Sequence, residues 1–196
     1  MHETVWLGRG GQGAFTAARL LGIAAMIDGK HAQAMPAFGP ERRGAPVFAY
    51  TRIDAARVRE RSAIRRADAA VILDASLLTQ VPTGFLTPDT LLLIDAESAP
   101  EKALGASGRT VPFPARRIAR EVLGSDHTNA ILFGALAALT GIVSPASAEA
   151  AILGEFGHGS KGERNLEAFR HARALAESFD ASVTRSSLTA DGGRHG

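Results

Sequence analysis

Three glycines in the stretch GRGGQG, residues 8–13, have the G-x-G-x-x-G spacing of a phosphate-binding turn. In such a turn Gly8, Gly10 and Gly13 let the backbone bend tightly between a strand and a helix. The free N–H groups at the start of that helix then favour a negatively charged ligand. The same glycines are also typical of close packing between a strand, a turn and a helix, so both interpretations stay open at this point.

A nicotinamide site would need a further element, an acidic residue near the end of the second strand that holds the ribose hydroxyls. The predicted second strand, HAQAM, runs into Pro36 without an Asp or a Glu. The sequence therefore disfavours an ordinary NAD-dependent dehydrogenase.

A second stretch that could bind an anion is FGPERRGAP, residues 38–46. Its prolines and glycines restrict the backbone, and Glu41, Arg42 and Arg43 lie between them. A guanidinium group held on a stiff loop loses little conformational entropy on binding, and its planar fork suits phosphates and carboxylates. We interpret the loop as a contact for an anion or a partner protein rather than as an ordinary exposed turn.

The 196-residue chain carries a net charge of +2, yet eight arginines stand against three acidic residues between Glu41 and Arg66. Such a basic segment can attract nucleic acid, an anionic cofactor or an acidic partner, and for residues 57–66 a solvated face is the favoured interpretation. We expect no nucleic-acid binding, because the segment lacks interleaved aromatic residues for base stacking.

Composition restricts the remaining chemistry. Cysteine is absent, which excludes disulfides, thiol nucleophiles and iron–sulfur clusters held by this chain. The six histidines show no zinc-ligand spacing, so we expect no metal site. The most apolar stretch, residues 130–143, is too short to cross a bilayer, and the first residues do not resemble a signal peptide. We therefore expect a cytoplasmic protein without a membrane contact.

The elements that would position these residues indicate an α/β fold. Continuous apolar runs predict buried, mostly parallel strands, and the second half of the chain is helical in pattern. We expect a single-domain, mostly parallel twisted sheet with helices on both faces, a Rossmann-like start and a helical C-terminal part. The domain should span residues 1–180, and residues 181–196 should form a disordered tail. The predicted strands cover residues 4–7, 31–35, 47–53, 67–74, 91–95 and 110–114.

No pair of side chains predicts a nucleophile with its base. Asp74 and Asp95 close two of the apolar runs, and with Ser76 they are interpreted as caps at the strand ends. Asn129, at the start of an apolar helix, is either a polar contact for a ligand or a local cap. We therefore predict no catalytic residue in this chain.

The sequence resembles the gamma subunit of pyruvate:ferredoxin oxidoreductase and of its close 2-oxoacid relatives. The stretches GRGGQGAFTAARLLGIAA and AQAMPAFGPERRGAPVFAYTRI carry most of the resemblance, which covers roughly residues 3–175. The FGPERRGAP form is more similar to the pyruvate and branched-chain 2-oxoacid members than to the others.

The resemblance implies a subunit that is not active alone. The complex would decarboxylate a 2-oxoacid oxidatively, form an acyl-CoA and pass electrons to ferredoxin or flavodoxin. Thiamine diphosphate, magnesium and iron–sulfur clusters would be held by the alpha, beta and delta partner subunits, and this chain would contribute subunit packing and a shared site for coenzyme A.

The resemblance also implies which residues form that cofactor site. They are Gly8, Gly10, Gly11, Gln12 and Gly13 in the turn, with Glu41, Arg42, Arg43 and Gly44 in the loop. The alternative hypothesis is a stand-alone dinucleotide-binding module or an NAD-linked oxidoreductase.

Overall fold

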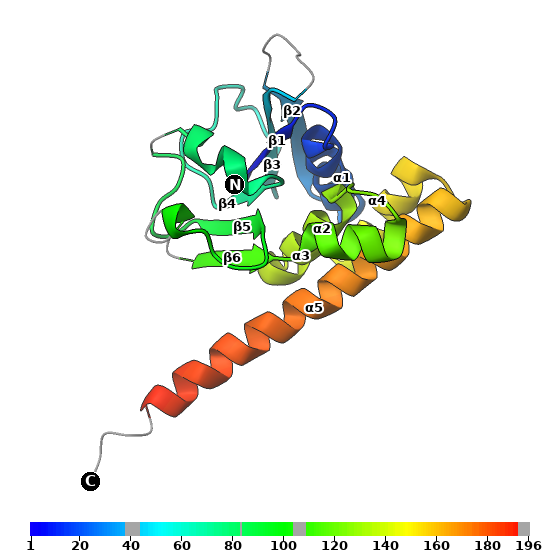
Figure 1. The fold of residues 1–196 in the computed structure, drawn as a ribbon. Helices are drawn as coiled ribbons and strands as arrows, with labels where there is room; N and C mark the ends of the chain where they lie inside the picture. The colour runs from blue at the N-terminus through cyan, green and yellow to red at the C-terminus, as the bar shows by residue number, and fades with distance from the viewer. Residues whose placement is uncertain (38–43, 83, 104–108, 192–196) are drawn as a thin grey trace.

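A computed structural model describes residues 1–37, 44–82, 84–103 and 109–191, with the backbone alone for residue 102 and residues 180–191. One six-stranded sheet, in the order β2-β3-β1-β4-β5-β6, organises this part of the chain (Figure 1). The strands are β1 (His2–Arg9), β2 (His31–Pro36), β3 (Pro46–Asp54), β4 (Ala69–Ile72), β5 (Leu91–Asp95) and β6 (Arg109–Phe113).

Four strands, β1, β4, β5 and β6, run parallel to one another, as the apolar runs predict. The other end of the sheet differs from a simple parallel unit, because β3 pairs antiparallel with both β1 and β2. The predicted strand–turn–helix–strand unit of β1, α1 and β2 is therefore present, but β3 lies between its two strands. Trp6 holds this insertion in place, since its indole N–H donates to Thr51 Oγ1 at 3.1 Å in the buried interior.

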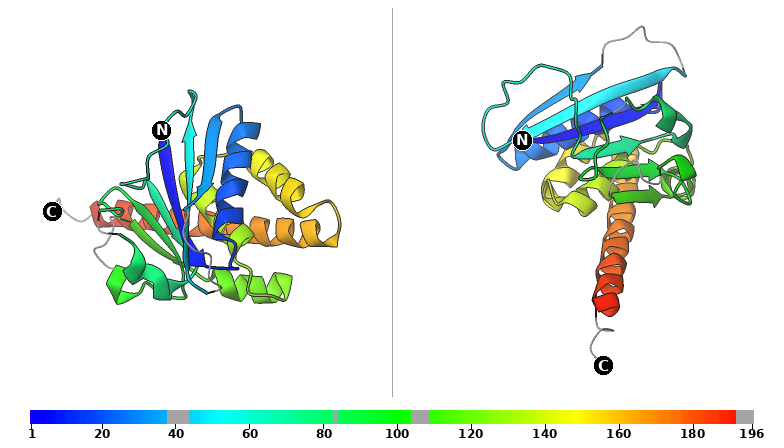
Figure 2. Two further views of the ribbon diagram at one scale, coloured as in Figure 1. Left: turned by 90° about the horizontal axis from the view of Figure 1, so that it is seen from above. Right: turned by 90° about the vertical axis from the view of Figure 1, so that its left-hand side faces the viewer.

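Long α-helices cover one face of the sheet, and the largest apolar core lies beneath them (Figure 2). These helices are α1 (Ala14–Ile27), α3 (Asn129–Thr140), α4 (Pro145–Phe156) and α5 (Ser160–Asp191). A short helix α2 (Ala115–Ile118) continues into a π-helical turn, η3 (Ala119–Leu123), on the way to α3. Ser144 caps α4 by accepting from Ser147 N–H, with Pro145 in the first turn.

The second face is covered by two short 3₁₀ helices, η1 (Ala75–Gln80) and η2 (Glu101–Ala103). Leu77 and Leu78 of η1 pack with Leu7, Ile72 and Ile94 of the strands in a separate apolar cluster. The predicted α/β fold with a mostly parallel sheet is thus confirmed, and the helices of the second face are 3₁₀ rather than α-helical.

The basic segment separates into a buried and an exposed part. Arg52 is 1% exposed, and its Nε lies 2.7 Å from Glu3 Oε1. The arginines of the stretch 57–66 are exposed, in agreement with a solvated face. The expected boundary at residue 180 stays a prediction; the backbone of α5 continues to Asp191 (Figure 1).

Candidate functional site

The glycine turn lies between the end of β1 and the start of α1, where the sequence places it. Gly11 and Gly13 have φ angles of +94° and +82°, a backbone region that favours glycine. Gly13 is the N-cap residue of α1, and no side chain caps this helix start. A side chain at Gly13 would begin 2.6 Å from Asn129 Nδ2, so the turn also packs tightly against the first residue of α3.

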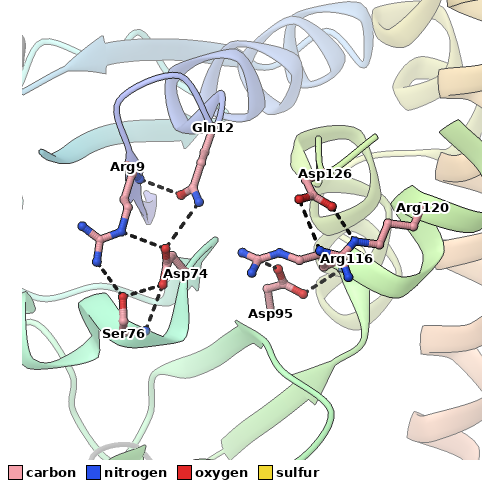
Figure 3. Close-up of polar contacts among 8 residues, drawn as sticks. All are labelled: Arg9, Gln12, Asp74, Ser76, Asp95, Arg116, Arg120 and Asp126. Carbon is pink, nitrogen blue, oxygen red and sulfur yellow. Dashed lines mark hydrogen bonds and ion pairs between the residues drawn. The ribbon is translucent and has the colours of Figure 1, made fainter. Parts of the chain in front are cut away.

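Arg9, beside the turn, belongs to a dense polar network with residues that follow β4 (Figure 3). Its Nε donates to Asp74 Oδ2 at 2.9 Å, and its Nη2 donates to Ser76 Oγ at 2.7 Å. Ser76 completes the network, because its N–H and its hydroxyl donate to Asp74 Oδ1 at 3.0 and 2.6 Å. The network joins the ends of two neighbouring parallel strands, where α/β folds place ligands.

Gln12 folds back onto its own turn. Its Oε1 accepts from the Arg9 N–H at 2.6 Å, and its Nε2 lies 3.4 Å from Asp74 Oδ2. A side chain at Gly8 would begin 3.2 Å from Gln12 Oε1, which explains why glycine stands there. The predicted site residue Gln12 therefore shapes the turn.

The end of the FGPERRGAP loop lies directly against the glycine turn. The Gly10 N–H donates to the Ala45 carbonyl at 2.9 Å, and Arg9 Nη1 donates to the Gly44 carbonyl at 3.0 Å. Of the predicted site residues, the structure thus brings Gly44 to the turn formed by residues 8–13. Glu41, Arg42 and Arg43 lie outside the described residues, so their part in the site stays a prediction.

A second polar cluster lies at the end of β5 (Figure 3). Asp95 Oδ1 accepts from the Arg116 N–H at 2.9 Å, and Asp95 Oδ2 lies 3.6 Å from Arg116 Nη2. Asp95 Oδ2 and Arg116 Nε are buried without a hydrogen-bond partner in the described part of the chain. Next to this pair, Arg120 Nε donates to Asp126 Oδ1 at 2.6 Å.

The two aspartates differ in their electrostatics. Burial raises the pKa of the Asp74 carboxyl, but the hydrogen bonds from Ser76 and Arg9 outweigh burial and hold this pKa below its ordinary value. Burial also raises the pKa of the Asp95 carboxyl, and there the hydrogen bond from the Arg116 N–H offsets it only partly. The surroundings of Asp74 thus stabilise its anionic form, whereas the burial of Asp95 makes its anionic form less stable than that of an exposed aspartate.

The predicted cap roles have mixed outcomes. Asp74 is the N-cap residue of η1 and accepts from Ser76 N–H, which confirms it as a cap. Asp95 also accepts from a helix N–H, that of Arg116, but the N-cap residue of α2 is Pro114. Asn129 is not the cap of α3, because the N-cap residue is Thr128. Its Oδ1 accepts from the adjacent Ala130 N–H at 2.9 Å instead.

Sequence reasoning missed two arginines of these clusters. Arg9 lies inside the glycine motif itself, two residues after the buried Leu7, which pairs with Ile72 of β4. Arg116 follows β6 in an arginine-rich stretch that carries no motif. Only the pairing of distant strands places them beside Asp74 and Asp95.

Two features are absent from the described residues. Within that part of the chain, no three acidic or histidine side chains gather in a way that could hold a metal ion. Likewise, none of the helices in the described ranges combines the length and the apolar character that a membrane span requires.

Comparison with known proteins gives consistent matches. A family profile described as pyruvate ferredoxin/flavodoxin oxidoreductase matches residues 3–175. The pyruvate/ketoisovalerate oxidoreductases common subunit gamma of Pyrococcus abyssi is 43% identical over 185 residues, which are 92% of this chain and 100% of that relative.

Two solved structures are similar in fold. The pyruvate oxidoreductase subunit PORC of Thermotoga maritima has a TM-score of 0.76 at 31% identity, covering 88% of this chain and 95% of its own. A 2-oxoglutarate:ferredoxin oxidoreductase from Magnetococcus marinus, with 2-oxoglutarate, coenzyme A and succinyl-CoA bound, has a TM-score of 0.78. At 20% identity, covering 90% of this chain and 31% of that one, the second likeness concerns the fold alone.

Proposed function

Because this chain belongs to the pyruvate ferredoxin/flavodoxin oxidoreductase family, we propose that it is the gamma subunit of a 2-oxoacid:ferredoxin oxidoreductase complex. The observation that carries the proposal is the 43% identity over the whole length of the Pyrococcus abyssi gamma subunit. The name of that relative favours pyruvate or a branched-chain 2-oxoacid as the substrate of the complex.

The complex would be an oxidoreductase that converts a 2-oxoacid and coenzyme A to an acyl-CoA in the cytoplasm. Its alpha, beta and delta subunits would hold thiamine diphosphate, magnesium and the iron–sulfur clusters, and would pass electrons to ferredoxin or flavodoxin. A chain without cysteine suits this division, since it has no thiolate for a cluster. The role of the present chain is to pack against the partners and to contribute to a shared coenzyme A site.

The coenzyme A contact would be formed by the glycine turn and the adjacent loop. Hydrogen bonds from Gly10 and Arg9 hold the returning end of the loop against the turn, so both stretches act from one edge of the sheet. Glu41, Arg42 and Arg43 would meet phosphates of coenzyme A or a carboxylate of a partner subunit. Gln12 would act by holding the turn in shape, because both ends of its amide already have partners within the chain.

Co-purification tests the subunit assignment. A tagged chain expressed from its native locus is expected to bring down partner subunits that carry thiamine diphosphate and iron–sulfur clusters. The purified chain alone should not oxidise any 2-oxoacid, whereas the recovered complex should do so with coenzyme A and ferredoxin. Turnover by the isolated chain would contradict the assignment.

Arginine variants test the loop. Arg42→Ala or Arg43→Ala should weaken assembly or acyl transfer by about 2–5 kcal/mol if the guanidinium is desolvated against an anion. Arg57→Ala is the matched control, since Arg57 is exposed and a surface substitution changes stability by about 0.5 kcal/mol or less. The loop loses its proposed role if both variants assemble and turn over like the control.

The alternative of a stand-alone dinucleotide-binding module or an NAD-linked oxidoreductase has no support among the relatives, which are gamma and PORC subunits. A nicotinamide site also needs an acidic residue near the end of the second strand, and here that strand ends at Pro36 without one.

A further inference from the structure

A pocket of about 550 Å³, called the β5-end pocket here, lies where β5 ends beside α2 and η3. None of the described residues that line it belongs to the proposed coenzyme A contact. Small-ligand sites usually have a volume of about 300–1,000 Å³, so this pocket has the size of a binding site. Arg120 and Glu121 line it from η3, a π-helical turn, and such turns are rare and are often found at functional sites.

Two buried atoms of the residues that line this pocket lack a hydrogen bond. Asp95 Oδ2 and Arg116 Nε have no hydrogen-bond partner in the described part of the chain, and the Asp95 side chain is only 4% exposed. The two side chains lie next to each other, but the 3.6 Å between Asp95 Oδ2 and Arg116 Nη2 is too long for a hydrogen bond (Figure 3). A buried acceptor and a buried donor without partners are costly. Both atoms therefore indicate a polar group that the described residues do not supply.

The charges around the pocket are balanced. Its charged lining consists of three acidic residues and three arginines, namely Asp95, Glu97, Glu121, Arg116, Arg117 and Arg120. Arg117 Nε lies 3.4 Å from Glu97 Oε1, and Arg120 forms an ion pair with Asp126. The lining therefore has no excess charge that would favour an ion of either sign.

The two unpartnered atoms restrict the ligand further. An ammonium group would satisfy Asp95 Oδ2, but it has no acceptor for Arg116 Nε. A phosphate or a carboxylate would accept from Arg116 Nε, but Asp95 would repel its negative charge. A primary carboxamide is neutral and has an N–H₂ donor and an oxygen acceptor side by side in one plane, so it can satisfy both atoms. A trans secondary amide directs its N–H and its C=O to opposite sides and cannot do so.

We propose that the β5-end pocket binds a ligand with a primary carboxamide group, whose N–H₂ donates to Asp95 Oδ2 and whose oxygen accepts from Arg116 Nε. The Arg116 side chain is 42% exposed, so it has room to turn outward and admit the ligand to the two buried atoms. Ala96 and Pro114 offer apolar surface to the rest of the ligand. Coenzyme A has only secondary amides, so this ligand is a different molecule. The chain alone can bind it, whether or not the chain is a gamma subunit.

Three small probes of the same shape test the charge and the hydrogen bonding of the ligand. Benzamide is neutral, benzoate is an anion and benzamidine is a cation at pH 7, and all three carry the same ring. Saturation-transfer NMR with the full chain would measure the dissociation constant of each. We expect benzamide to bind with a dissociation constant of about 1 mM and the two ions to bind at least about tenfold more weakly. Absence of benzamide binding, or a smaller preference for benzamide over either ion, would overturn the proposal.

The carboxamide can come from a free small molecule or from an Asn or Gln side chain of a partner subunit. The same benzamide titration of the complex recovered by co-purification distinguishes these sources. Binding of benzamide to the isolated chain but not to the complex identifies a partner side chain that fills the pocket. Binding to both identifies a small molecule.

Two variants test the two proposed contacts. Asp95→Asn replaces the acceptor at Oδ2 by an N–H₂ donor, while its oxygen can still accept from the Arg116 N–H. Arg116→Lys keeps the positive charge but has a carbon atom in place of Nε. Each variant should raise the dissociation constant of benzamide by about tenfold or more, because a hydrogen bond to a charged group is lost. If either variant binds benzamide like the parent, the proposal is wrong.

Asp89→Asn and Arg57→Lys are the matched controls, since both residues are exposed and neither lines the pocket. Each control makes the same chemical change as one of the two test variants, and it should change the dissociation constant of benzamide by less than about twofold. The melting temperature of all four variants shows that the fold is intact where binding is compared. Equal weakening in a test variant and its control would mean a general charge effect and would overturn the site.

Discussion

Asp74 and Asp95 close two neighbouring parallel strands in the same way, and yet their surroundings are opposite. Both oxygens of Asp74 accept hydrogen bonds, from Arg9, Gln12 and Ser76. Asp95 uses one oxygen and buries the other without a hydrogen bond in the described part of the chain. The same sequence pattern, an apolar run that ends on aspartate, thus gives one carboxylate with hydrogen bonds to both oxygens and one carboxyl group with a hydrogen bond to one oxygen.

The alternation of side chains along the strands explains the difference. Leu93 belongs to the core beneath the α-helices, so Asp95, two residues later, points to that face and meets Arg116. Ile72 belongs to the cluster under η1, so Asp74 points to the opposite face. A polar edge can therefore contain two chemically distinct sites on the two sides of one sheet.

Asp74→Asn should have the largest effect, because it disturbs the hydrogen bonds that Asp74 accepts from Arg9, Gln12 and Ser76. Donors point at both Asp74 oxygens, so an amide group would face donors with its own N–H₂ in either orientation. We expect a loss of about 2–4 kcal/mol in the free energy of unfolding, measured by urea denaturation. Asp126→Asn is the matched control, since water screens the exposed Arg120–Asp126 pair and its loss should lower the free energy of unfolding far less. Equal losses in both variants would contradict the comparison.

Gly13→Ala should have the next largest effect, because it disturbs the turn that holds Gln12 and Arg9 near Asp74. The positive φ angle costs about 1–2 kcal/mol for alanine, and the new Cβ would lie 2.6 Å from Asn129 Nδ2. Gly11→Ala has a similar φ angle but no atom within 4 Å, so it should show the backbone cost alone. Thermal unfolding of both variants isolates the contact with α3, and identical melting temperatures would show that this contact carries no energy.

Local patterns were sufficient to predict much of this edge. Apolar runs that end on Asp74 and Asp95 predicted two buried strands, and the glycine spacing predicted a turn between strand and helix. These features depend on residues close together in the chain, where periodicity and backbone freedom decide the structure. For the same reason the Ser144 cap of α4 was predictable.

Contacts between distant segments could not be predicted from such patterns. Arg9 meets Asp74 because Leu7 pairs with Ile72, and no local rule fixes the register between these strands. The insertion of β3 between β1 and β2 likewise depends on long-range pairing. Asn129 was predicted as a contact or a cap, and the structure shows that Thr128 is the N-cap residue of α3 and that the Asn129 amide lies against Gly13.

Asp95→Asn should lower the free energy of unfolding less than Asp74→Asn does. An amide at this position can keep its oxygen toward the Arg116 N–H while it removes a buried charge. We expect the free energy of unfolding at pH 7 to stay within about 1 kcal/mol of the parent. A loss as large as that of Asp74→Asn would show that the charge of Asp95 stabilises the fold as much as the charge of Asp74 does.

The pH dependence of stability should differ in sign between the two sites, although its amplitude is the smallest effect expected. The lowered pKa of Asp74 contributes stability that is present above the ordinary aspartate pKa of about 4 and is lost as pH falls through the lowered value. The raised pKa of Asp95 contributes stability that is present below about pH 4 and is lost as pH rises through the raised value. Relative to the parent, Asp95→Asn should therefore gain stability as pH rises above about 4, whereas Asp74→Asn should gain as pH falls below it. Urea denaturation of the three proteins across this range measures both slopes, and slopes of the same sign would mean that the two carboxyls share one kind of environment.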